Sequence, residues 1–152
     1  MATPETRAEV TRRLGASPER IFGAFASADL VSRWLSPSPD IVLQVLAYDF
    51  RVNGAYRFEY LVPSGAVMHV HGIFRSITPP RELIFSWVIE PPDEHSGINS
   101  EVRVSITETA GGSLLSIVHE RLDRAGAAER HRGGWLGALE CLESLLRGRT
   151  QE

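Results

Sequence analysis

Two histidines near the C-terminal end of the sequence have side chains suited to proton transfer. His119 is in phase with Leu115 and Ile117 along an alternating apolar stretch, which predicts that its side chain points inward. His131 lies on the apolar stripe of a helical segment, one turn before Trp135. An imidazole in a cavity can act as an acid or base near neutral pH, or hydrogen-bond a polar ligand group. An inward histidine is also a common structural residue of a core, so both interpretations stand at this point.

A second pair of histidines has a spacing compatible with a metal site. His69 and His71 are two residues apart on one face of a predicted strand. A structural metal site needs further ligands, however, and Val70 and Phe74 mark the other face of this strand as the inward one. The acidic loop at residues 93–95 is typical of a solvated turn. We therefore predict that no metal is bound and that both histidines face solvent.

The sequence lacks the residues that several kinds of catalysis require. All 16 basic residues are arginine, so neither a Schiff-base lysine nor a P-loop lysine is present. No Gly-x-Ser-x-Gly elbow, His-Glu-x-x-His motif, glycine-rich phosphate loop or dinucleotide fingerprint occurs. The one cysteine, Cys141, lies beside an apolar stripe and is interpreted as a packing residue. We therefore assign no catalytic residue and expect no cofactor.

The strongest candidate for a binding site is a set of aromatic and apolar residues that should converge between a sheet and the C-terminal helix. Such residues often form only a packed core. A strongly curved sheet under one helix also leaves a volume that a ligand can occupy. The candidate ligand-binding residues, including the two histidines above, are Trp34, Tyr56, Phe58, Tyr60, Phe74, Phe85, Trp87, His119, His131, Trp135, Leu139 and Leu142.

The elements that would position these residues can be read from apolar spacing and turn chemistry. Residues 8–14 alternate as a strand, and Ser17, Pro18 and Glu19 supply an N-cap, a first-turn proline and a first-turn acid. Two short helices are expected to follow, with a break at residues 28–29. Six segments rich in β-branched and aromatic residues then predict strands at 41–50, 56–62, 67–77, 83–89, 102–109 and 114–120.

These segments predict an α+β fold with an antiparallel meander that is covered on one face. Tyr56, Phe58 and Tyr60 alternate with polar neighbours, which gives the strand one buried and one solvated face. From about 127 to 147, apolar residues recur every three or four positions and predict a long helix lying across the concave side of the sheet. The three glycines within 133–137 either allow close approach of a neighbouring segment or keep a cavity open.

Length and composition bound the class of protein. At 152 residues the chain fits a single domain, predicted at 8–148 between a flexible N-terminus at 1–7 and a C-terminal tail at 149–152. Its 43% hydrophobic and 23% charged residues are ordinary for a globular protein. The net charge of −3, with arginines scattered along the chain, argues against a nucleic-acid partner. No stretch resembles a membrane span or a signal peptide, so we expect a cytoplasmic protein.

Short motifs along nearly the whole chain resemble one known family. The sequence is similar to the START-like (Bet v 1-like, SRPBCC) domains of the subfamily named after the C-terminal domain of the activator of Hsp90 ATPase. Asn53 stands where that family usually has a glycine, and asparagine tolerates the same turn. The resemblance implies a helix-grip fold, with a curved sheet of about seven strands around the long helix and an internal cavity. The matching motifs are SPERIF (17–22), ADL (28–30), RWL (33–35), DFRVNG (49–54), PPREL (79–83), FSW (85–87), GGS (111–113), His119-Glu120 and Gly134-Trp135.

The sequence leaves three functional hypotheses open. The first is a binding module without catalytic activity, whose partner is a small hydrophobic molecule of lipid, polyketide-like or aromatic character. The second, suggested by START-like aromatases and cyclases, is an enzyme in which His119 or His131 moves protons on a bound carbonyl compound. The third is a protein-interaction domain like the co-chaperone, with an unidentified protein partner. We expect the first, and do not carry over an Hsp90 function from the subfamily name.

Overall fold

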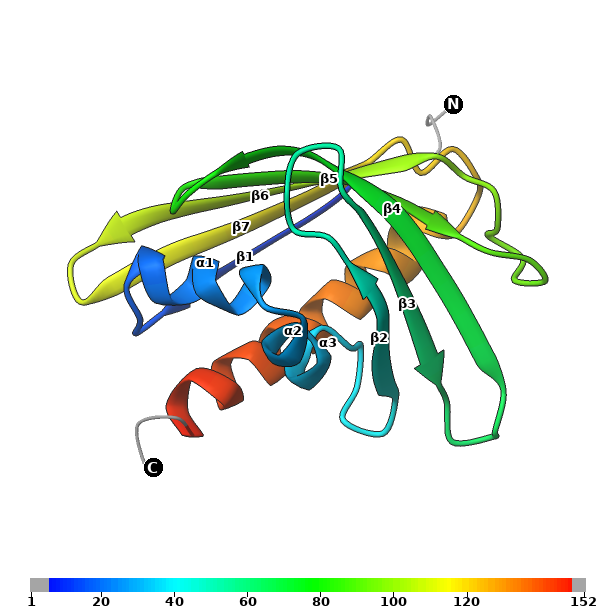
Figure 1. Ribbon diagram of the computed structural model, residues 1–152, viewed down its shortest axis with the longest axis horizontal. Helices are drawn as coiled ribbons and strands as arrows, with labels where there is room; N and C mark the ends of the chain where they lie inside the picture. Colours follow the sequence, from blue (N-terminus) through cyan, green and yellow to red (C-terminus); the bar gives the residue numbers. More distant parts are fainter. Residues whose placement is uncertain (1–5, 149–152) are drawn as a thin grey trace.

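The computed structural model describes residues 6–148, so the predicted tail at 149–152 and most of the predicted flexible segment at 1–7 lie outside the described residues. Seven strands and three helices follow one another in the predicted order (Figure 1). The bounds are β1 Ala8–Leu14, α1 Pro18–Ala26, α2 Ala28–Trp34, β2 Val42–Tyr48, β3 Ala55–Leu61, β4 Val67–Thr78, β5 Glu82–Ile89, β6 Ser100–Thr109, β7 Gly112–Glu120 and α3 Ala127–Gly148.

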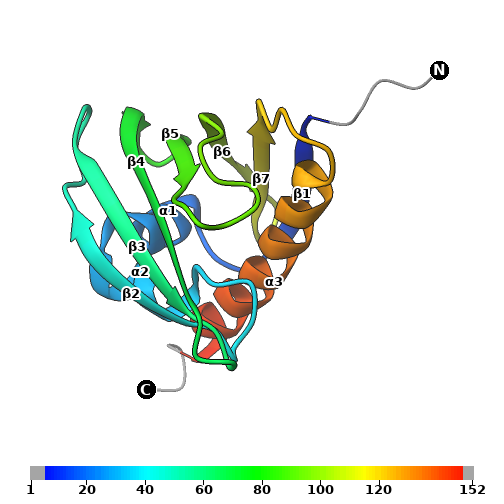
Figure 2. The same ribbon diagram turned by 90° about the vertical axis from the view of Figure 1, so that its right-hand side faces the viewer.

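The strands form one antiparallel sheet in the order β1-β7-β6-β5-β4-β3-β2. The last six strands are a meander in which each strand pairs with the next, and β1 joins the far edge by pairing with β7. Register shifts between Val45 and Ala47 and between Phe74 and Ser76 mark bulges, which increase the twist of a sheet. Figure 2 shows the sheet curving around α3, which crosses its open side. The predicted helix-grip fold is confirmed.

The helices α1 and α2 are separated by one extended residue. The side chain of Ser17 accepts a hydrogen bond from the backbone N–H of Arg20, and Pro18 begins α1, as the N-cap pattern predicted. Ser27 has an extended backbone and caps α2 in the same way, so the break lies one residue before the predicted position. Trp34 at the end of α2 is fully buried, and its indole N–H donates to the carbonyl of Ala24. This bond ties the two short helices together.

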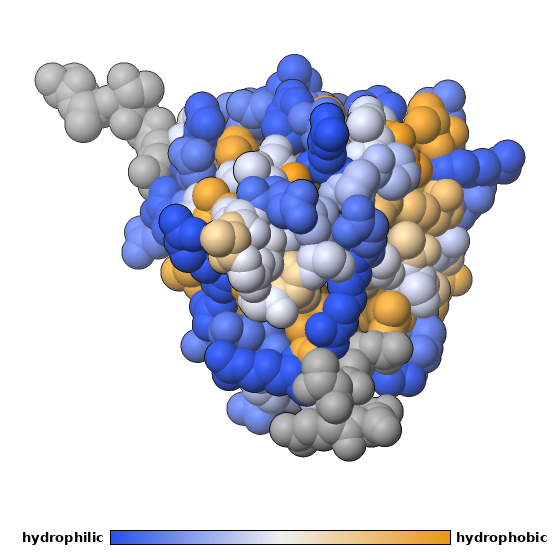
Figure 3. Space-filling view, turned by 90° about the vertical axis from the view of Figure 1, so that its left-hand side faces the viewer, coloured by the Kyte–Doolittle hydropathy of each residue, from blue (hydrophilic) through white to orange (hydrophobic). Residues whose placement is uncertain are grey.

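The core fills the concave side of the sheet under α1, α2 and the C-terminal half of α3. Phe25, Phe58, Phe74, Ile117 and Leu139 are each at most 2% exposed. Hydrophilic residues dominate the face seen in Figure 3, where the hydrophobic ones form only small separate groups. Within the described residues, no helix is long and apolar enough to span a membrane.

The helix α3 meets the segment between α2 and β2 at a single close approach. A Cβ atom on Gly137 would lie 1.9 Å from the carbonyl oxygen of Pro37, whereas a Cβ on Gly133 would meet nothing within 4 Å. Closer to the C-terminal end of the helix, Glu143 accepts two hydrogen bonds from the Arg12 guanidinium of β1. Gly137 therefore permits the close approach of a neighbouring segment, whereas a side chain on Gly133 would enter open space.

We predict opposite effects of alanine at these two glycines. Gly137→Ala should lower the free energy of unfolding by roughly 1–3 kcal/mol or more, because the new methyl group overlaps backbone. Gly133→Ala should raise it by about 0.5–1 kcal/mol, because alanine favours the helix. Urea unfolding of both variants checks this. Equal stabilities would contradict the close approach.

Candidate functional site

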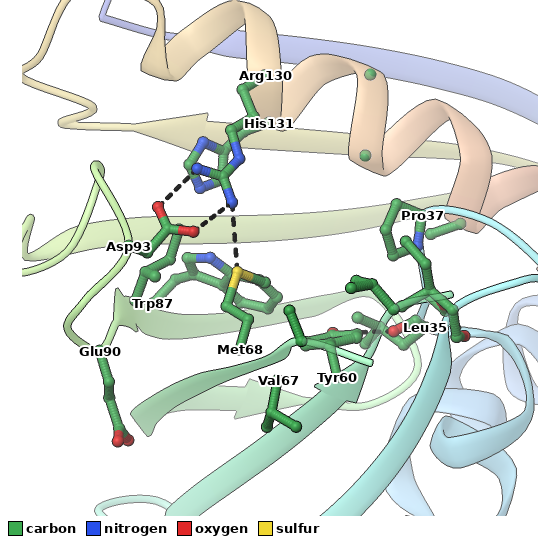
Figure 4. Close-up of a pocket in the computed structure, with 18 of the residues that line it drawn as sticks. Leu35, Pro37, Tyr60, Val67, Met68, Trp87, Glu90, Asp93, Arg130 and His131 are labelled. Carbon is green, nitrogen blue, oxygen red and sulfur yellow. Dashed lines mark hydrogen bonds and ion pairs between the residues drawn. The ribbon is translucent and has the colours of Figure 1, made fainter. Parts of the chain in front are cut away.

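A cavity of about 520 Å³ lies between the N-terminal half of α3 and the ends of β3, β4 and β5 (Figure 4). This volume is within the range of about 300–1,000 Å³ that is usual for small-molecule sites. Besides α3 and the strands, the segment between α2 and β2 and the loop between β5 and β6 contribute to the lining. The lining residues are Leu35, Ser36, Pro37, Ile41, Tyr60, Val62, Ala66, Val67, Met68, Trp87, Ile89, Glu90, Pro91, Pro92, Asp93, Arg130, His131, Gly133, Gly134, Trp135 and Ala138.

The walls of the cavity are mainly apolar. Trp87 and Ile89 come from the inward face of β5, and Trp135 faces them from α3, with the two indole rings 5.7 Å apart. Besides Arg130, His131 and Trp135, the side of α3 that borders the cavity carries Gly133, Gly134 and Ala138. Because glycine and alanine are small, space remains between the helix and β5 beside the larger side chains.

Charged side chains gather at one end of the cavity. Arg130 of α3 binds both carboxylate oxygens of Asp93 in the β5–β6 loop, at 2.6 and 2.8 Å, and also lies 3.3 Å from the sulfur of Met68. The Arg130 hydrogen bonds hold the pKa of Asp93 below its usual value, so this carboxylate stays ionised. The ion pair therefore joins the helix to the loop across one end of the cavity, as Figure 4 shows.

A second carboxylate, Glu90, lies on the lining where β5 ends. It accepts hydrogen bonds from Arg57 and lies 2.9 Å from Nδ1 of His71. These contacts, with the Arg57 hydrogen bond the largest, lower the pKa of Glu90 to about 2. Among the lining residues, Glu90 and Asp93 are thus anionic and Arg130 is the one arginine.

His131 places an imidazole on the cavity wall. Its Nδ1 donates to the carbonyl of Ala127, 2.7 Å away, because a backbone carbonyl can only accept. Burial lowers the pKa of His131, which favours the neutral ring. In that form Nε2 carries a lone pair and can accept a hydrogen bond from a ligand.

His119 lies behind the cavity in a fixed chain of hydrogen bonds. The indole N–H of Trp135 donates to His119 Nδ1 at 3.0 Å, and an indole N–H can only donate. The other ring nitrogen, Nε2, lies 2.7 Å from the hydroxyl of Ser100, which in turn donates to the carbonyl of Trp87. His119 must therefore be neutral with its proton on Nε2. Burial lowers its pKa well below the usual value, and the nearby His131 lowers it further.

The indole N–H of Trp87 differs from the polar groups of Tyr60 and Trp135 on the same walls, which are hydrogen-bonded within the protein. The Tyr60 hydroxyl donates to the carbonyl of Leu35 at 2.9 Å. The Trp87 Nε1 is buried and has no hydrogen-bond partner within residues 6–148, although the residue as a whole is 8% exposed. This nitrogen is an unused donor on the cavity wall.

The structure divides the twelve sequence-predicted ligand residues into two groups. Tyr60, Trp87, His131 and Trp135 line the cavity together. The other eight pack elsewhere in the interior and are absent from the lining. They are Trp34, Tyr56, Phe58, Phe74, Phe85, His119, Leu139 and Leu142.

Most of the lining residues that the sequence did not reveal come from connecting segments. Pro37 and Ile41 precede β2, and Val62 lies in the turn after β3. Ile41 and Val62 were expected to be the terminal residues of predicted strands, and no pattern in the sequence marked them or Pro37 as lining residues. The loop at 93–95 was expected to be a solvated turn, but Asp93 lines the cavity and His95 is only 7% exposed. That expectation was wrong because the loop folds back toward α3.

The remaining candidates lie away from the cavity. His71 is exposed and His69 is half-buried, and their partners are the carboxylates of Glu90 and Glu59 respectively. No group of three or more potential metal ligands is found in the part of the chain that the structure describes. Cys141 is half-buried, and desolvation raises the pKa of its thiol, which disfavours the reactive thiolate.

A curved antiparallel sheet that grips a long C-terminal helix and leaves a cavity between them defines a START-like domain of the helix-grip class. The chain belongs to the Activator of Hsp90 ATPase homolog 1-like protein family, whose model matches residues 15–147. This confirms the resemblance seen in the sequence. No curated protein matches the chain.

Solved structures of similar proteins share this fold over nearly their full length. A protein from Chromobacterium violaceum is 27% identical with a TM-score of 0.83, and the match covers 93% of this chain and 97% of that one. The AHSA1 protein from Silicibacter pomeroyi is 22% identical with a TM-score of 0.83, covering 94% and 99%. The AHSA1-like protein from Aeromonas hydrophila is 20% identical with a TM-score of 0.77, covering 96% and 95%.

The neutral state of His119 predicts that the protein loses stability in mild acid. The pKa of His119 is lowered in the folded protein, so below about pH 6.5 the unfolded chain binds more protons than the folded one. The stability that this residue contributes above that pH is therefore lost progressively as the pH falls below about 6.5. The measurement is urea unfolding across this range.

The matched variant is His119→Gln, whose amide can both donate and accept but does not titrate. It should be less stable at neutral pH, yet its stability should fall less steeply with acid than that of the wild type. Identical pH slopes in the two proteins would show that His119 is not held neutral.

Proposed function

We propose that this protein binds one small hydrophobic molecule, of lipid, polyketide-like or aromatic character, in the cavity between β5 and α3. The observation that carries the proposal is the cavity itself: about 520 Å³, bordered by the rings of Trp87, Trp135 and Tyr60. Apolar walls with a few polar groups are the usual composition of a small-molecule site.

The physical basis of binding is the removal of apolar surface from water. Aromatic rings such as Trp87 and Trp135 present large rigid faces, and contact with them orders few rotatable bonds. A ligand that fills the cavity buries its apolar surface against these rings. The favourable free energy of this burial exceeds the cost of the ligand's lost translational freedom, so we expect micromolar affinity. The membership of a START-like family supports the same function.

Of the two histidines that the enzyme hypothesis proposed for proton transfer, only His131 lines the cavity. His119 has both ring nitrogens engaged within the protein, by Trp135 and Ser100, and does not line the cavity. It therefore acts as a structural residue, and proton transfer to a ligand would depend on His131 alone. The interaction-domain hypothesis is motivated by the family name and by no particular surface of this structure.

The proposed function predicts binding of a neutral apolar dye. N-phenylnaphthylamine, whose fluorescence rises in apolar surroundings, should bind with micromolar affinity. Gly134→Phe should weaken binding at least about tenfold, because Gly134 lines the cavity and a Cβ there has room beyond Pro37, so a phenyl ring at this position would occupy cavity volume.

Leu136→Phe is the matched control, because Leu136 is 46% exposed on the same helix and is not a lining residue. This variant should bind the dye as the wild type does. The melting temperature of each variant is measured in parallel, so that loss of binding is separated from loss of folding. Absence of dye binding to the wild type, or equal binding by Gly134→Phe, would contradict the proposal.

A further inference from the structure

The three tryptophans of this chain differ in what their indole N–H groups bind. Trp34 donates to the carbonyl of Ala24, and Trp135 donates to Nδ1 of His119, both at 3.0 Å. Trp87 Nε1 is buried as well, but no acceptor within residues 6–148 bonds to it. A buried donor without a partner is unfavourable, and it is rare enough in folded proteins to require an explanation.

The position of the Trp87 ring restricts where a partner can come from. The ring is held by neighbouring rings, with centroids 5.7 Å from Trp135, 5.9 Å from His119 and 6.2 Å from Phe58. Figure 4 shows the indole nitrogen on the edge of the ring nearest His131 and Asp93, at the polar end of the cavity. Because the ring is packed and lines the cavity, a molecule inside the cavity can supply the missing acceptor.

We propose that the ligand of this protein is a neutral molecule with an apolar body and a carbonyl oxygen that accepts a hydrogen bond from Trp87 Nε1. This inference rests on the proposed function and names the ligand class. Ketones, esters and lactones of a size that fits the cavity have the required chemistry, whereas a pure hydrocarbon leaves the indole N–H without a partner.

The charges at the same end of the cavity favour a neutral ligand over a carboxylate. Arg130 is already bound to both oxygens of Asp93, and the carboxylate of Glu90 points away from Trp87 in Figure 4 and is paired with Arg57. His131 donates its Nδ1 proton to Ala127 and offers only a lone pair at Nε2 when it is neutral. An anionic head group would therefore find no unpaired cation among these lining residues, whereas a neutral carbonyl group needs none.

The test compares two ligands that differ in one atom group. Acetylnaphthalene carries a carbonyl oxygen, and isopropenylnaphthalene, substituted at the same ring position, has a methylene group in its place. Displacement of N-phenylnaphthylamine measures both affinities. We expect the wild type to prefer the ketone by about 5- to 10-fold, the size of one hydrogen bond to a buried donor.

Two tryptophan variants locate the source of that preference. Trp87→Phe keeps an aromatic ring but removes the N–H, so the ketone and the hydrocarbon should bind about equally. Trp135→Phe is the matched control, because Trp135 also lines the cavity but its N–H is bound to His119. It should retain the preference for the ketone even if both affinities fall.

A second readout uses the wild-type protein alone and does not depend on the folding of any variant. A proton–nitrogen correlation spectrum resolves three indole N–H signals, one for each tryptophan. Acetylnaphthalene should move the Trp87 signal downfield and isopropenylnaphthalene should not, whereas the Trp34 signal should stay in place with either ligand because its N–H is bound to Ala24.

The outcomes separate the two proposals. If both ligands bind with equal affinity and the Trp87 signal does not move downfield with the ketone, the carbonyl inference is wrong while binding in the cavity stands. If neither ligand binds and the dye does not bind either, the proposed function is wrong and the carbonyl inference is wrong with it. Preference for the ketone that persists in Trp87→Phe would also overturn the inference.

Discussion

The hydrogen-bond chain from Trp135 through His119 and Ser100 to the carbonyl of Trp87 joins the helix α3 to three strands of the sheet. One end of the chain is a group that can only donate and the other is a group that can only accept, so the proton on every intermediate atom is determined. A buried polar chain of this kind is stabilising only when every member is satisfied. It therefore fixes the distance between α3 and β5, and the size of the cavity depends on that distance.

The two halves of α3 carry side chains of different size, and this explains why space remains beside the His119 hydrogen bonds. In the C-terminal half, Leu139, Leu142 and Leu146 point into the core and are at most 6% exposed. In the N-terminal half, Gly133 and Gly134 present no side chain toward β5. Glycines inside a helix cost stability, and here only Gly137 is required by a close neighbour. The glycines on the cavity side are therefore consistent with selection for volume.

Much of the fold could be predicted from the sequence, because strand alternation and helical spacing are local properties. Val104, Ile106 and Ile117 face the core as their spacing indicated, and the inward position of His119 followed from the same rule. The cavity could not be predicted in this way. Alternation marks Phe58 and Tyr60 as equally inward, yet Tyr60 borders the cavity while Phe58 packs among Tyr48, Tyr56 and Trp87 in the core.

The same limit applies to the polar end of the cavity. Asp93 and Arg130 are 37 residues apart, and no local pattern indicates that the β5–β6 loop reaches α3. The side chain of Arg130 is 36% exposed and that of Asp93 18%, so water screens part of their attraction. A partly exposed ion pair contributes little to stability and can separate without a large cost. The His119 chain, in contrast, is buried, so it does more than this ion pair to hold α3 on the sheet.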